Sequence, residues 1–116
     1  MKWQELSSDE QLDGIIALSF TRAQVIFKHS TRCSISSMAK SRLERSEAPA
    51  TADFHCLDLI RHRNLSDKIA SVFSVTHESP QVLLIVKGEC VYEESHIGIN
   101  MDEINGQINL SSNPAS

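Results

Sequence analysis

The feature that most constrains the fold is a run of five apolar residues late in the chain, Val82-Leu83-Leu84-Ile85-Val86. A strand with one solvated face alternates apolar and polar residues, whereas a strand covered on both faces is apolar throughout. The run therefore predicts a central β-strand. A strand of this kind needs a packing layer on each side of it, which favours a layered α/β fold.

Apolar periodicity and capping residues predict the remaining elements. The further strands are expected at residues 24–29, 54–59 and 90–92, the last returning as a hairpin from a turn at Lys87-Gly88-Glu89. Four helices are expected. The first is capped by Ser7 or Ser8, with Glu10 or Gln11 as the reciprocal partner, the second covers residues 34–45, the third is capped by Asn64 or Ser66, and the fourth begins at Met101 or Asp102. In chain order, the residues expected to face the core are Leu12, Ile15 and Ile16; Ile35, Met38, Ala39 and Leu43; Leu65, Ile69, Val72 and Phe73; and Ile104, Ile108 and Leu110.

The order of these elements is helix, strand, helix, strand, helix, strand, strand, helix. The first two strands should be parallel, joined by a right-handed crossover, and the last two should form an antiparallel hairpin. This order predicts the thioredoxin-like three-layer fold, a mixed central sheet of about four strands with helices on both faces. We expect one domain over residues 1–110 and a disordered polar tail over residues 111–116.

Composition excludes several classes of function. The 116 residues include 11 basic and 15 acidic side chains, for a net charge of −4, and no basic stripe with interleaved aromatic residues occurs. Nucleic acid is therefore not an expected partner. The apolar runs are too short to span a membrane, and the N-terminus has no signal-peptide pattern, so we expect a cytoplasmic protein.

Cysteine usage points to thiol chemistry. Three cysteines, Cys33, Cys56 and Cys90, cannot close a disulfide framework, and neither C-x-x-C nor H-x-x-x-H spacing is present, so no metal is expected. Cys33 falls where the first strand ends and the second helix begins. At a helix start, unpaired N–H groups and the helix dipole favour the thiolate, and Lys28 and Arg32 add positive charge nearby. The alternative is a buried cysteine that packs as a small hydrophobe.

Local motifs indicate a family. A cysteine at the first strand-to-helix corner, Pro80 just before the buried strand and the turn at 87–89 together match thioredoxin-like proteins. More narrowly, the segments 27–36, 57–63, 77–81 and 94–96 resemble the YtxJ-like bacillithiol-system proteins, also called monothiol bacilliredoxins. The resemblance runs from Trp3 to about Ile104. Ser34 stands where members of that family commonly have proline.

The resemblance implies a monothiol thiol-disulfide oxidoreductase with Cys33 as its catalytic residue. Ser36 stands where a dithiol enzyme has its resolving cysteine, and a serine hydroxyl cannot displace a disulfide. An outside thiol must therefore resolve Cys33, and the resemblance identifies it as bacillithiol, a co-substrate, with no bound cofactor. The implied partners are S-bacillithiolated proteins, and the chain is expected to be a monomer or a weak dimer.

Further residues have expected roles around Cys33. Arg32 and Ser36 are expected to stabilise the thiolate, although Ser36 is equally compatible with a solvated helix serine. The resemblance implies that Ser79 and a cis Pro80 bind an extended substrate segment. Thr31, Ser95 and His96, with Arg32, are the expected contacts for bacillithiol, while His96 is equally compatible with an ordinary surface residue, and His29 is expected beneath this corner.

Alternatives stay open at this stage. Cys56 and Cys90 are expected to be core thiols, and the alternative is that one of them acts as a distant resolver. The whole chain is also compatible with a thioredoxin-fold binding module that has little redox activity. A third interpretation is a monothiol reductase that uses another low-molecular-weight thiol.

Overall fold

A computed structural model describes residues 1–111 of the chain. Five strands form one mixed sheet in the order β1-β3-β2-β4-β5, in which β1, β3 and β2 are parallel and β4 and β5 are antiparallel to their neighbours. The strands are β1 (Gln4–Glu5), β2 (Ala23–His29), β3 (Ala52–Asp58), β4 (Gln81–Val86) and β5 (Glu89–Ser95). The helices are α1 (Asp9–Leu18), α2 (Ser34–Arg45), α3 (Arg63–Phe73) and α4 (Met101–Ser111), with a short 3-10 helix, η1 (His96–Gly98).

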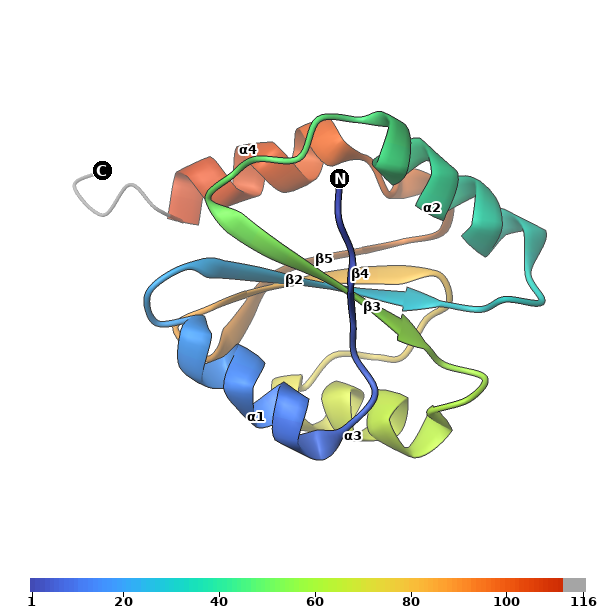
Figure 1. The fold of residues 1–116 in the computed structure, drawn as a ribbon, viewed down its shortest axis with the longest axis horizontal. Coiled ribbons are helices and arrows are strands. Elements are labelled where there is room, and N and C mark those ends of the chain that lie inside the picture. Colours follow the sequence, from blue (N-terminus) through green and yellow to red (C-terminus); the bar gives the residue numbers. More distant parts are fainter. Residues whose placement is uncertain (112–116) are drawn as a thin grey trace.

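The helices cover both faces of the sheet, α2 and α4 on one side and α1 and α3 on the other (Figure 1). Each face has its own apolar core, because successive residues of β2 and β4 point to opposite sides. Val25 and Phe27 pack toward Leu43 of α2, whereas Ile26 packs toward Leu12 of α1. The thioredoxin-like fold class predicted from the sequence is confirmed, and the fully apolar run of β4 lies in the interior of the sheet as expected.

The prediction of about four strands missed β1. This strand has only two residues, both polar and exposed, and pairs with His55 and Cys56 at the edge of the sheet. So short a polar segment carries no alternating pattern that a strand prediction could use. Beside it, Trp3 stacks on Phe27 with ring centroids 5.6 Å apart, which fixes the N-terminal segment on the α2 side of the sheet.

The predicted inner face of α2 was wrong in part. Ala39 and Leu43 are buried as expected, but the third buried residue of this helix is Ser36. Ile35 and Met38 are exposed, Met38 by 62%. The reason is how the helix is rotated about its own axis. The Ser36 hydroxyl binds the Ser30 N–H just after β2, so Ser36 faces the sheet and Ile35 and Met38 face away from it.

Two other helices also differ in detail from the prediction. The N-cap of α3 is His62, which comes before the predicted Asn64 or Ser66, because the Asp58 carboxylate accepts the Ile60 N–H at 3.0 Å and sets the turn earlier. Val72 and Leu110, predicted to face the core, are exposed. Ser111 is the last residue of α4, and the rest of the predicted tail, residues 112–116, lies outside the described residues.

The capping and turn predictions hold where local chemistry dictates them. Ser8 caps α1 by accepting the Gln11 N–H, and the Gln11 side chain reciprocally accepts the Ser7 N–H at 2.7 Å. Lys87 and Gly88, both at positive φ, form the two-residue turn between β4 and β5, one residue shorter than predicted because Glu89 already pairs with Val86 as the first residue of β5. Within residues 1–111, no helix is long and apolar enough to cross a membrane.

Candidate thiol site

Cys33 lies at the start of α2, where it is the N-cap residue. Its backbone is extended, with φ −112° and ψ 120°, and its carbonyl accepts the Ser37 N–H at 3.0 Å. The Cys33 side chain makes no capping hydrogen bond, and the residue is partly exposed. The first turn of α2 contains no acidic residue. A thiolate at this position meets the positive end of a helix dipole and unpaired N–H groups, which stabilise negative charge.

A buried hydrogen-bond network fixes the turn that carries Cys33. The Ser36 hydroxyl is fully buried, accepts the Ser30 N–H at 2.9 Å and lies 2.7 Å from Nδ1 of His29. Burial lowers the pKa of the His29 imidazole, and Lys40 adds to the effect. Near neutral pH the imidazole is therefore uncharged, and a hydrogen bond joins its Nδ1 to the Ser36 hydroxyl. The network ties the first turn of α2 to the end of β2.

The expected roles of Ser36 are revised by these contacts. Interpretation as a solvated helix serine is wrong, since its side chain is fully buried. The two hydrogen bonds that its hydroxyl makes among the described residues go to Ser30 and His29. Ser36 thus sets the position of the Cys33 turn from beneath. His29 lies under this corner, as expected, with its ring stacked on that of Phe27.

Lys28, expected to add positive charge near Cys33, lies on the other face of the sheet. Its side chain is fully buried on the α1/α3 side of the sheet, where Nζ donates to the Ser66 carbonyl at 3.0 Å. Strand alternation explains the difference, because Lys28 shares a sheet face with Ile26 and not with Phe27 and His29. Arg32 and Thr31, the other residues before Cys33, are exposed.

Strand register brings the start of β4 beside the end of β2. Lys28 of β2 pairs with Gln81, the first residue of β4. Pro80 therefore lies at the level where the chain leaves β2 and turns toward Cys33. The Ser79–Pro80 peptide bond is cis, and the Pro80 carbonyl accepts the His96 N–H at 3.0 Å.

The end of β5 completes this side of the molecule. Ser95 pairs with Gln81 and is the N-cap of η1, which contacts α2. The His96 side chain is exposed, and its Nε2 lies 3.6 Å from the Glu78 carboxylate. Segments from β2, α2, β4 and η1 thus meet at one end of the sheet, around a partly exposed thiol.

The other two thiols have different surroundings. Burial raises the pKa of Cys56 to about 11 and also raises that of Cys90. Cys90 pairs with Ile85, which lies opposite Gln24, so it is at the far end of the sheet from Cys33. The strand from Gln24 to His29 spans about 17 Å at roughly 3.3 Å per residue. Both cysteines are partly buried against the two apolar cores.

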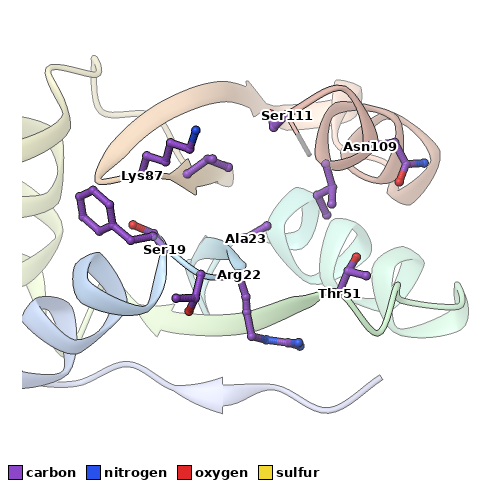
Figure 2. A pocket seen from close by; sticks show the side chains of 11 residues that line it. Ser19, Arg22, Ala23, Thr51, Lys87, Asn109 and Ser111 are labelled. Atoms are coloured by element: carbon purple, nitrogen blue, oxygen red, sulfur yellow. The ribbon is translucent and has the colours of Figure 1, made fainter. Parts of the chain in front are cut away.

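A cavity of about 340 Å³ lies at that far end, between the start of β2, the end of β4 and α4 (Figure 2). None of the predicted site residues lines it. Its lining includes Phe20, Val86 and Ile108, together with the residues labelled in Figure 2. Among residues 1–111, no group of three or more His, Cys, Asp or Glu side chains is arranged to hold a metal ion.

Sequence reasoning missed two residues at the thiol end of the sheet. His77, in the loop after α3, was noted only as part of a motif, although its Nδ1 lies 3.2 Å from Nζ of Lys28. Gln81, fully buried beside Lys28, was also overlooked. The available signal was the pair of long polar residues, Lys28 and Gln81, next to the apolar runs of two strands.

Comparison with known proteins agrees with this geometry. Residues 4–104 match the family model described as Monothiol bacilliredoxin BrxC. A solved structure described as "A putative oxidoreductase with a thioredoxin fold" is 33% identical, covers 88% of this chain and 89% of its own, and has a TM-score of 0.74. Thioredoxin from Trypanosoma brucei brucei is 16% identical, with coverage of 93% and 92% and a TM-score of 0.75. Thioredoxin from Malassezia sympodialis is 15% identical, with coverage of 96% and 91% and a TM-score of 0.74.

Proposed function

Since the chain belongs to the monothiol bacilliredoxin family, we propose that it removes bacillithiol from S-bacillithiolated proteins, with Cys33 as the catalytic residue. One observation carries this proposal: Cys33 is the partly exposed N-cap of α2, at the end of the sheet where β4 begins. A thiol at a helix start is the arrangement that favours a nucleophilic thiolate.

The first step is thiol-disulfide exchange. The Cys33 thiolate attacks the bacillithiol sulfur of the mixed disulfide, and a new disulfide forms between Cys33 and bacillithiol while the old disulfide breaks. The client cysteine leaves as a thiolate and takes a proton from water. No net oxidation occurs, because one disulfide replaces another.

The second step needs a thiol from solution. Ser36 has no sulfur, and burial holds Cys56 and Cys90 in the protonated form, which does not attack disulfides. A second bacillithiol, as its thiolate, attacks the bacillithiol sulfur on Cys33. This releases the Cys33 thiolate together with bacillithiol disulfide, which an external reductant must recycle. The cycle requires a reducing pool of small thiol, so the cytoplasm is the compartment in which we expect it.

Substrate contacts are proposed from the same end of the molecule. The Ser79 backbone, next to Pro80, is suited to pair with an extended segment of the client. Thr31, Arg32, Ser95 and His96 are our candidates for the contacts to bacillithiol, because the first two come directly before Cys33 and the last two begin η1, which contacts α2. Arg32 is the candidate charge both for the Cys33 thiolate and for a bacillithiol carboxylate.

A client-release assay tests the proposal. Wild-type protein and Cys33→Ser are incubated with a bacillithiolated client and excess bacillithiol, and release is followed by mass spectrometry. We expect the variant to lose all activity and Cys56→Ser and Cys90→Ser to keep most of it. Equal release by wild type and Cys33→Ser would refute the proposal.

The same assay identifies the recycling thiol. Bacillithiol, glutathione and coenzyme A are supplied in turn, each with a client that carries the matching mixed disulfide. We expect bacillithiol to give the highest kcat/KM. Faster turnover with either of the other thiols would leave the monothiol mechanism intact but reject the assigned co-substrate.

A further inference from the structure

The loop between α3 and β4, residues 74–80, contains the Ser79–Pro80 segment and is held from beneath by two buried side chains. These are Lys28 of β2 and Gln81 of β4, which are cross-strand partners and share a face of the sheet. Both are completely inaccessible to solvent. A buried ammonium is costly unless its protons are hydrogen-bonded, so its contacts reveal what it stabilises.

Lys28 reaches two groups on the α3 side. Its Nζ donates to the Ser66 carbonyl at 3.0 Å and lies 3.2 Å from Nδ1 of His77. The Ser66 hydroxyl lies 3.4 Å from the same ring nitrogen. His77 is the only member of this set that belongs to the loop, and its ring is at the surface. Lys28 thus connects the end of β2 to His77, in the middle of the loop between α3 and β4.

Gln81 holds the residues on either side of His77. Its Nε2 donates to the Thr76 carbonyl at 3.0 Å, and its Oε1 accepts the Glu78 N–H at 3.3 Å. Its Nε2 also donates to Glu93 on β5 at 3.0 Å. Three consecutive loop residues are therefore fixed to the sheet immediately before Ser79.

The charges around this contact favour hydrogen bonding near neutral pH. Burial lowers the pKa of Lys28 to about 8, and Asp67 opposes that shift. The pKa of His77 is lowered by burial and by Lys28, and Arg63 lowers it further, whereas Asp67 and Glu78 act to raise it. At pH 7 Lys28 is a cation that donates, and His77 is neutral and accepts through Nδ1. A hydrogen bond with one charged partner is stronger than a neutral one.

We propose that the hydrogen bond from buried Lys28 to His77 is a positioning element of the thiol site: it holds the Ser79 backbone where a client segment must pair beside Cys33. This inference rests on the proposed function. It predicts an effect on protein clients that small disulfides do not share, because a small disulfide makes no strand-like pairing with Ser79.

Two substitutions of surface residue His77 test this inference. His77→Asn keeps an acceptor oxygen close to the position of Nδ1, and His77→Leu removes the acceptor. We expect His77→Leu to raise KM for a bacillithiolated protein by about three- to tenfold with kcat unchanged, as for the loss of one hydrogen bond. Its kinetics with a small bacillithiol mixed disulfide should equal those of wild type. His77→Asn should stay within about twofold of wild type in both assays, and His62→Leu serves as the histidine-to-leucine control.

Amide hydrogen exchange of residues 76–79 provides a readout that does not depend on activity. His77→Leu should exchange faster than wild type in this segment, and His77→Asn should not. Unchanged exchange in His77→Leu, or equal losses in the two variants, would overturn the inference. A wild-type protein without activity toward the client would instead reject the proposed function, and exchange would still decide whether this hydrogen bond orders the loop.

Discussion

At the end of the sheet where β2 ends and β4 begins, three fully buried polar side chains, Ser36, Lys28 and Gln81, hold loops on both sides of an accessible thiol. The opposite end has the cavity of about 340 Å³, and there buried Ser19 fixes the β4–β5 turn by accepting the Gly88 N–H at 2.8 Å. Both ends therefore use buried polar groups, but only one has them around a partly exposed thiol. The comparison teaches that the cavity and the partly exposed thiol of this protein lie at opposite ends of the sheet, so the proposed thiol chemistry does not use the cavity.

The largest expected difference between the two ends is in cysteine reactivity. Iodoacetamide at pH 7 should modify Cys33 first, and Cys90 at the far end about a hundredfold or more slowly, because burial raises the pKa of Cys90 and leaves little thiolate. Cys56, with its pKa raised to about 11, should react as slowly. Mass spectrometry of tryptic peptides against time measures the three rates. Comparable rates at Cys33 and Cys90 would remove the distinction between the two ends.

The next effect concerns the charge of Lys28. Because burial lowers its pKa from 10.5 to about 8, the unfolded chain binds this proton more tightly than the folded chain. The stability that this group contributes is therefore fully present above pH 10.5 and is lost as the pH falls through about 8. The difference in unfolding free energy between wild type and Lys28→Met should rise across this interval, by at most about 3 kcal/mol. Urea unfolding at a series of pH values measures it, and a difference independent of pH would contradict a buried ammonium.

The two features behind these predictions, the position of Cys33 and the burial of Lys28, are not equally predictable from the sequence. The position of Cys33 at a strand-to-helix corner follows from local pattern alone, as do the β4 strand and a serine cap of α1, which the pattern narrowed to Ser7 or Ser8. The contact of Lys28 with His77 joins residues that are 49 positions apart. Nothing local indicates it, and the general rule that lysine is exposed predicts the opposite.

Ser36 shows a second limit of prediction from sequence. The spacing of Ile35, Met38, Ala39 and Leu43 predicted one inner face of α2, and the spacing of Ser36, Ala39 and Leu43 fits a helix face equally well. Apolar character favoured the first, but the short turn from β2 brings Ser36 onto the Ser30 N–H. Which face of a helix meets the sheet is decided by the geometry of its connection, and that information is not contained in periodicity.

Two buried serines, Ser36 at the thiol end of the sheet and Ser19 at the cavity end, test whether only the thiol end affects client release. Ser36→Ala and Ser19→Ala each leave a backbone N–H without its acceptor, that of Ser30 or that of Gly88. Each change should lower the unfolding free energy by about 1–3 kcal/mol. Only Ser36→Ala should also slow client release, by about tenfold, because it frees the turn that positions Cys33. Chemical denaturation and the release assay are measured on the same preparations, and equal loss of activity in both variants would mean that overall stability alone governs the rate.

The smallest effect is expected at the exposed pair of Glu78 and His96. Both side chains are about half exposed, and Nε2 of His96 lies 3.6 Å from the Glu78 carboxylate, so Glu78→Gln should change the unfolding free energy by less than about 1 kcal/mol. The substitution should also change KM for bacillithiol in a predictable direction. If His96 contacts a carboxylate of bacillithiol, Glu78 competes for the same ring, and its removal should lower KM for bacillithiol by about twofold. Glu89→Gln makes the same charge change at the far end and should leave KM unaltered. A higher KM in Glu78→Gln would mean that the carboxylate holds His96 in place for the substrate, and the pair would then join Lys28 and Gln81 among the contacts that fix this end of the sheet.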